Sequence, residues 1–181
     1  MFNIGDYVIY KHEVCIIKEI KKGRNDKDYY TLRPIDDDTL KIELPVDFAN
    51  KSIKELITKK KALELIKNIP NIEVIKIDTK LLDDVYKNLL SENTHESLIR
   101  IIKTTYLRNK ERIENKRKTS DKDEYYFNLA EKYLYNELSI ALDKTFDETK
   151  EYIICMNFIL FPSINYLFFS TSLIINSLVS L

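Results

Sequence analysis

The side chains that could carry out acid–base or metal chemistry are few and scattered along the chain. His12 and His95 are the only histidines, and neither has a partner at the helical or hairpin spacing that a zinc or catalytic site needs. We therefore interpret His12 as a polar strand residue and His95 as a residue near a helix N-terminus. The three consecutive aspartates at 36–38 lack the spaced ligands, the glycine and the terminal glutamate of a calcium loop, so they are typical of an exposed turn.

The cysteines and glycines exclude further classes of protein. Cys15 and Cys155 have no metal-binding spacing and no signal peptide before them, which indicates a reduced, cytoplasmic chain. With two glycines in the whole chain there is no phosphate-binding glycine loop and no dinucleotide fingerprint. We therefore expect a protein that is not an enzyme, with no cofactor and no metal.

Charge is balanced overall but unevenly distributed. Lys+Arg and Asp+Glu both total 29, so the net charge of zero gives no argument for nucleic acid. The segment 100–118, however, has a local excess of positive charge, and the following segment 121–151 is acidic. Such a run is either the solvated face of a helix or a surface that binds phosphate, with salt-sensitive and largely sequence-independent affinity. The basic residues are Arg100, Lys103, Arg108, Lys110, Arg112, Lys116, Arg117 and Lys118.

Residues 1–50 have the pattern of short strands. Apolar and β-branched residues fill 2–10, 14–20 and 28–34, and residues 40–44 alternate with period two before Pro45 stops the strand. Four or five short strands of this kind predict a small SH3-like or Tudor-like β-barrel. The segment 40–44 is a candidate edge strand to which a partner could add a strand.

From residue 55 to 152 the period becomes helical. Apolar residues recur at three- and four-residue spacing, and Asp78 precedes one such segment at 81–90. We expect four or five short helices in a compact all-α domain, so the predicted fold class is α+β with two domains. Capping pairs mark three of the helix starts: Asn93 with Glu96, Ser120 with Asp123, and Thr145 with Glu148.

Residues 153–181 form an apolar tail without a charged residue. Its length makes it formally a transmembrane candidate. Pro162, the asparagines and serines that follow it and the missing cationic flank argue against a membrane anchor. A buried extension, a disordered extension and a sequence fused by a shifted reading frame stay open.

Three motifs follow one another in the first module: Phe2-x-x-Gly5-Asp6-x-Val8-x-Tyr10, Tyr29-Tyr30-x-Leu32 and Leu40-Lys-Ile-Glu-Leu-Pro-Val46. In their order and spacing they resemble the N-terminal module of the CarD/CdnL family, which also occurs in transcription-repair coupling factors. The segments 89–91, 101–102, 119–124 and 130–142 are similar to that family's helical domain. The resemblance covers about residues 1–152.

The resemblance implies a bacterial, cytoplasmic and monomeric transcription regulator. Its Tudor-like module would dock on the β subunit of RNA polymerase, and its helical module, residues 55–152, would bind promoter DNA and stabilise the open complex. The residues carried over for polymerase binding are Tyr10, Lys41, Glu43 and Pro45. The candidates for DNA binding are Lys80, Lys87, Arg117, Lys118 and Lys122.

The chain departs from the family in three places. Many members carry a tryptophan that enters the minor groove, whereas this chain has no tryptophan and has Asp78 or Thr79 near that place. The residues 11–14 replace a frequent proline and glycine, and Glu43 stands where some relatives have a basic residue. Any DNA contact is therefore expected to be electrostatic. An adaptor that binds polymerase or another protein without functional DNA contact, with or without a membrane tether at its tail, is the alternative.

Overall fold

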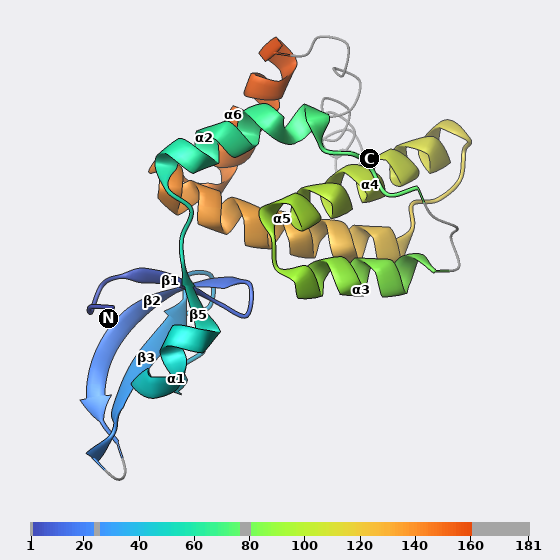
Figure 1. Cartoon of the computed structure of the whole chain (residues 1–181). Helices are drawn as coiled ribbons and strands as arrows, with labels where there is room; N and C mark the ends of the chain where they lie inside the picture. Colours follow the sequence, from blue (N-terminus) through green and yellow to red (C-terminus); the bar gives the residue numbers. More distant parts are fainter. Residues whose placement is uncertain (1, 24–25, 77–80, 161–181) are drawn as a thin grey trace. The chain divides into compact units, whose positions relative to one another are not determined.

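A computed structural model describes residues 2–23, 26–76 and 81–160 (Figure 1). The chain divides into two compact units, Met1–Thr58 and Lys59–Leu181. The described part of the first unit consists of five strands and one short helix, and the described part of the second unit is helical. The predicted α+β class, with a Tudor-like β fold followed by a helical domain, is therefore confirmed.

The first unit is an antiparallel sheet that curls into half a barrel. Along the described residues the strand order is β4-β3-β2-β1-β5, which leaves β4 and β5 at the two edges. The central strand β2 carries a bulge between Ile17 and Glu19, and a bulge bends a strand and increases its twist. The strands are β1 (Tyr7–Tyr10), β2 (Glu13–Lys22), β3 (Asp28–Pro34), β4 (Ile42–Pro45) and β5 (Ile53–Glu55).

Side chains from all five strands and from the segment 46–52 build one apolar core. Tyr30 is buried there, and its hydroxyl accepts a hydrogen bond from the Phe2 backbone N–H at 3.2 Å and donates to the Phe2 carbonyl at 3.3 Å. The start of the chain is therefore fastened to β3. The buried set is Val8, Cys15, Ile17, Tyr30, Leu32, Leu44, Ala49 and Ile53.

The turn between β1 and β2 uses two residues with positive φ. Lys11 has φ 48° and His12 has φ 78°, and they connect the paired residues Tyr10 and Glu13. Two successive left-handed residues form the type of tight turn that favours asparagine and glycine. The hairpin thus places two residues larger than glycine in a less favourable backbone conformation.

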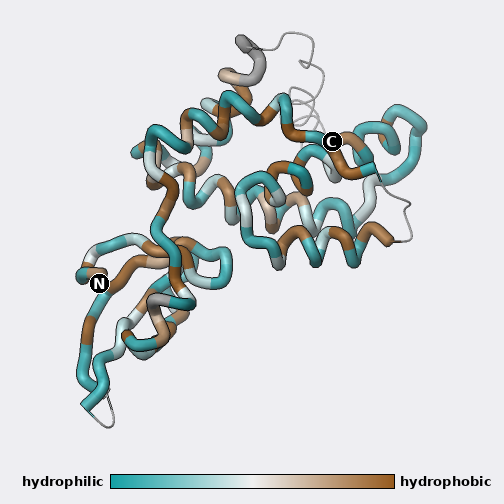
Figure 2. The backbone as a smooth tube through the Cα atoms, viewed as in Figure 1, coloured by the Kyte–Doolittle hydropathy of each residue, from teal (hydrophilic) through white to brown (hydrophobic). Residues whose placement is uncertain are grey.

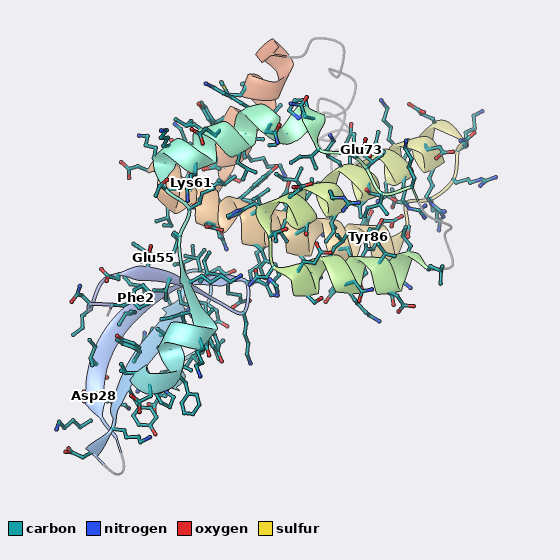
Figure 3. The ribbon with its side chains drawn as sticks, viewed as in Figure 1. Phe2, Asp28, Glu55, Lys61, Glu73 and Tyr86 are labelled. Carbon is teal, nitrogen blue, oxygen red and sulfur yellow. The ribbon has the colours of Figure 1, made fainter. Side chains whose placement is uncertain are left out.

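The first unit ends later than predicted. The sequence placed its end at residue 50 and the start of the helical domain at 55, but β5 pairs with β1 through Tyr10–Ile53, Ile9–Lys54 and Val8–Glu55. A short helix, α1 (Val46–Ser52), leads into this strand, whose last residue Glu55 is labelled in Figure 3. Neither element was predicted, because the segment 46–55 has no sustained apolar period. The first unit extends to Thr58.

The second unit is built around the antiparallel pair α4 and α5, with α3 packed against both and α2 against α5 and α6. Hydrophobic and hydrophilic positions alternate along each helix in Figure 2, as amphipathic helices require. Its elements are α2 (Lys59–Asn68), the 3₁₀ turn η2 (Ile69–Asn71), α3 (Leu82–Glu92), α4 (His95–Glu114), α5 (Asp121–Leu142) and α6 (Phe146–Leu160).

Two of the three predicted helix caps are confirmed. Ser120 accepts a hydrogen bond from the Asp123 backbone N–H at 3.3 Å, and Thr145 and Glu148 bond each other's backbone N–H groups. The prediction for Asn93 is wrong. Asn93 instead ends α3 with φ 51°, and Thr94 caps α4 by accepting from Ser97. Asp78 lies outside the described residues.

The helical unit also runs past its predicted end at residue 152. Helix α6 continues to Leu160, and Ile153, the first residue of the predicted tail, is buried at 1% exposure. The tail beyond residue 160 lies outside the described residues. Among the described residues, no helix is long and apolar enough to cross a membrane.

Candidate functional site

The edge strand β4 carries two of the four residues assigned to polymerase binding, Glu43 and Pro45, and a third, Lys41, immediately precedes it. Its register with β3 pairs Ile42 with Leu32, Glu43 with Thr31, Leu44 with Tyr30 and Pro45 with Tyr29. Leu44 is buried while Glu43 is exposed, so the strand has one core face and one outer face. Pro45 has no backbone N–H to donate, and it ends the strand at the first turn of α1.

Glu43 lies between two lysines on the outer face of the sheet. Its Oε1 is 2.5 Å from Lys21 Nζ and 3.2 Å from Lys41 Nζ. The hydrogen bond from Lys21, followed by the one from Lys41, holds the pKa of Glu43 below its ordinary value. The carboxylate therefore stays ionised, and this face presents charges of both signs.

Tyr10 does not belong to this surface. It lies on β1, between β2 and β5 in the sheet, whereas β4 is the opposite edge beyond β3. Its ring is half-buried against the core, with Lys11 Nζ 5.3 Å from the ring centroid. The structure thus brings Lys41, Glu43 and Pro45 together and leaves Tyr10 apart.

Sequence reasoning missed an exposed aromatic residue next to β4. Phe48 lies on α1, three residues after Pro45, and is 59% exposed. Leu40, just before β4, is also exposed. Large exposed apolar side chains beside an edge strand are common anchors of protein interfaces. An aromatic residue immediately after a proline-terminated strand was the available signal, but its exposure depended on the unpredicted helix.

In the helical unit, the aspartate Asp123 joins three helices. It is 1% exposed and accepts hydrogen bonds from the Tyr86 hydroxyl of α3 at 3.1 Å and from Arg108 Nε of α4 at 3.2 Å. Burial, together with this aspartate, raises the pKa of Tyr86, which is labelled in Figure 3. The hydrogen bonds from Tyr86 and Arg108 offset the cost of burying the Asp123 carboxylate.

A second aspartate, Asp83 of α3, holds two of the predicted DNA-binding lysines. Lys87 Nζ lies 2.9 Å from its Oδ2, and Lys122 Nζ of α5 lies 3.5 Å from its Oδ1. The Tyr126 hydroxyl donates to the same Oδ1 at 2.9 Å. Bonds from Lys87 and Tyr126 lower the pKa of Asp83 to about 2. The packing of α3 on α5 thus unites Lys87 and Lys122.

The turn between α4 and α5 exposes the other two described candidates, Arg117 and Lys118. Arg112 Nε donates to the Lys118 carbonyl at 2.7 Å, and Asn109 accepts from the Ser120 backbone N–H at 2.9 Å. These bonds fix the turn one residue before α5 begins. Lys122 lies in the first turn of that helix, so it follows Arg117 and Lys118 closely along the chain. Lys80 lies outside the described residues.

The basic run 100–118 does not form one surface. Lys103 is buried, and its Nζ donates to the carbonyls of Ile69, Pro70 and Ile72. Burial lowers the pKa of this lysine. Arg108 is bound to the buried Asp123. Part of the run therefore fastens helices together, and the exposed part is concentrated at the turn.

The remaining candidates for chemistry have structural roles. His95 Nε2 lies 2.8 Å from the buried Glu137 and joins the start of α4 to α5. Asp37 accepts hydrogen bonds from the Thr39 backbone N–H at 2.9 Å and the Thr39 hydroxyl at 2.6 Å, which confirms the turn interpretation of the aspartate run. Burial raises the pKa of the Cys15 thiol to about 12, so this thiol is unreactive.

Comparison with known proteins identifies the first unit. No curated protein matches the chain. The family model of the CarD-like/TRCF RID domain, the RNA polymerase-interacting domain, matches residues 2–57, and this range coincides with the curled sheet, α1 and β5. The match supports a transcription-related function that involves RNA polymerase. Residues 2–57 of this chain are therefore similar to the CarD-like/TRCF RID domain, and that family is one of non-catalytic interaction domains.

Proposed function

We propose that this protein is a non-enzymatic transcription regulator that binds the β subunit of RNA polymerase and promoter DNA, and so stabilises the open complex. The observation that carries the proposal is the RID domain match on a unit whose edge strand β4 lies beside exposed side chains. We also propose that the protein acts as a cytoplasmic monomer.

Strand addition to β4 is the docking mode that we propose. The outer edge of a terminal strand presents backbone N–H and C=O groups to a partner strand. The length of β4 and the proline at its end restrict pairing to a short register at residues 42–45. Lys41 and Glu43 would then contact the partner beside the backbone bonds, and Phe48 would provide an apolar anchor.

The DNA contact is proposed for Lys87, Lys122, Arg117 and Lys118 of the helical unit. These side chains are exposed, and all of them lie on α3 or at the α4–α5 turn and the start of α5. Phosphate contacts of this kind are weak and independent of sequence. Binding to polymerase would raise the local concentration of the helical unit at the promoter, so a weak contact would suffice.

The second candidate is a polymerase- or protein-binding adaptor without functional DNA contact. Two observations favour it: Lys87 and Lys122 are already paired with Asp83, and the chain has no tryptophan to enter the minor groove. A steep salt dependence of DNA binding that is lost in the double variant Arg117→Ala/Lys118→Ala would exclude the adaptor.

The docking proposal is tested by measuring binding of the full chain to the isolated β subunit. The variant Lys41→Ala/Glu43→Ala should bind at least about fivefold more weakly, the loss typical of a contributing interface pair. The control Lys18→Ala/Glu19→Ala removes the same residue types from the exposed part of β2 and should bind like the unchanged chain. Equal binding by both variants would contradict the use of β4, and no binding by the unchanged chain would contradict the β subunit as partner.

A further inference from the structure

Asp83 is the point at which cations from two helices of the described chain meet. Lys87 comes from the next turn of the same helix, α3, and Lys122 comes from the first turn of α5. Each ammonium group lies on a different oxygen of this carboxylate, at 2.9 Å and 3.5 Å. One negative charge is therefore shared by two of the lysines assigned to DNA.

We propose that Asp83 sets the DNA affinity of the helical unit by competing with phosphate for Lys87 and Lys122. The inference rests on the DNA contact proposed above. A lysine held by a carboxylate must share or leave that partner when a phosphate approaches. The carboxylate itself then lies close to the phosphate and repels it. Both effects weaken binding compared with the same surface carrying a neutral residue at position 83.

The competition is permanent under physiological conditions. The pKa of Asp83 is about 2, mainly because of the hydrogen bond from Lys87, so the group is ionised at any pH at which the protein works. Two further aspartates lie in this region. Asp123 is buried and bound to Arg108 and Tyr86, so it does not compete at the surface, and Asp84 acts on Lys87 through its charge less strongly than Asp83 does. Asp83 is therefore the carboxylate that competes with phosphate for Lys87 and Lys122.

The experiment measures the affinity of the full chain for a short, fluorescently labelled duplex over a range of salt concentrations. Asp83→Asn keeps the size of the side chain and an oxygen that can accept from Tyr126. We expect about fivefold tighter binding at low salt, the value that two exposed ion pairs of ordinary strength give. The salt dependence should steepen by up to about two counterions, because two more lysines become available to phosphate.

Asp84→Asn is the matched control, since it removes the same charge from the neighbouring, exposed position of α3. We expect it to tighten binding by about twofold or less, through the general loss of one negative charge. In a chain that carries Lys87→Ala and Lys122→Ala, Asp83→Asn should bring no larger gain than Asp84→Asn. This result would show that the effect of Asp83 acts through the two lysines.

Tyr126→Phe separates competition from a purely structural role of Asp83. It removes the 2.9 Å hydrogen bond between α5 and α3 and leaves both lysine pairs in place. If Asp83 only fastens the helices, both Asp83→Asn and Tyr126→Phe weaken DNA binding, and the inference is overturned. It is also overturned if Asp83→Asn binds no more tightly than Asp84→Asn while the unchanged chain binds DNA. If the unchanged chain and all variants fail to bind, the DNA contact itself is contradicted along with the inference.

Discussion

The two units of this protein place their charges differently. In the sheet unit the ion pairs lie at the surface, and the side chains of Glu43 and Lys41 are 46% and 45% exposed. In the helical unit the paired carboxylates of Asp123, Glu137 and Glu131 are 10% exposed or less. Exposed pairs contribute little to stability, whereas breaking a buried pair is costly. The ion pairs of the sheet unit can therefore rearrange when a partner binds, while the pairs of these three buried carboxylates in the helical unit are part of the fold.

Replacing Asp123 should show the largest difference in stability between the two units. Asp123→Ala leaves Arg108 and the Tyr86 hydroxyl without their buried acceptor, and we expect a loss of about 3 kcal/mol in the free energy of unfolding. Urea titration of the full chain measures it. The corresponding change in the sheet unit, Glu43→Ala, should leave the unfolding midpoint unchanged. Similar losses in both variants would remove the distinction between the units.

Lys150→Met tests whether the stability contributed by a buried ion pair of the helical unit depends on pH. Lys150 Nζ lies 3.0 Å from Glu131, whose pKa is raised by burial and partly lowered again by this lysine. Without the lysine the pKa of Glu131 rises further. A raised pKa in the folded state means stability that is present below the unfolded value and lost as pH rises through the folded value. We expect a loss of about 1–2 kcal/mol at pH 7, since Lys150 is partly exposed, and almost none at pH 4.

The same urea titrations at the two pH values test this expectation. Lys22→Met is the control, because Lys22 forms an exposed pair with Asp26 in the sheet unit. It should have no effect at either pH. Equal destabilisation by Lys150→Met at both pH values would mean that the burial of Glu131 does not control the effect.

The exposed side of the sheet unit should affect binding rather than stability. Phe48→Ala removes an aromatic side chain that is 59% exposed beside β4, and we expect about tenfold weaker binding to RNA polymerase. Thermal unfolding should change little, since more than half of the side chain is exposed. Ile4→Ala removes an equally exposed apolar side chain from another part of the unit and serves as the control. Weaker binding by both variants would show a loss of general hydrophobicity rather than a local anchor.

The smallest expected effect comes from residues with positive φ. Replacing them should raise the free energy of unfolding by a similar amount in both units. Lys11→Asn/His12→Gly fits the positive φ angles of the β1–β2 turn and should stabilise the chain by about 1 kcal/mol. Lys116→Gly, at φ 53° after α4, should give about 0.5–1 kcal/mol. The free energy of unfolding measures both. A gain in only one unit would mean that side-chain contacts, not backbone angles, determine these positions.

Local features of the fold could be predicted and features that require packing could not. Ser120 and Thr145 were identified as caps because a cap depends on residues three apart. Asn93 was misassigned because Asn93 and Thr94 can both cap a helix, and only the left-handed φ of Asn93 separates them. Strand β5 was missed because it is three residues long and forms only by pairing with β1, more than forty positions earlier.

The candidate site follows the same division. The sequence indicated Lys87, Arg117, Lys118 and Lys122 as candidates for DNA binding. All of them are exposed, and DNA binding itself stays a prediction. It could not show that Lys103, in the middle of the basic run, is buried against three backbone carbonyls. The position of Lys103 in α4 gives it a buried face, and a charge count along the chain does not distinguish faces.

By itself the sequence determined the two-part organisation, the change from a period of two to a helical period, and the motifs of the RID domain, because these are properties of residues close together in the chain. Only the tertiary structure decided that β4 is an edge, that Tyr10 lies away from it and that Asp83 joins Lys87 to Lys122. Strand order and the packing of α3 on α5 bring together residues that are far apart in sequence, and the distances and burial that result determine which charges are available to a partner.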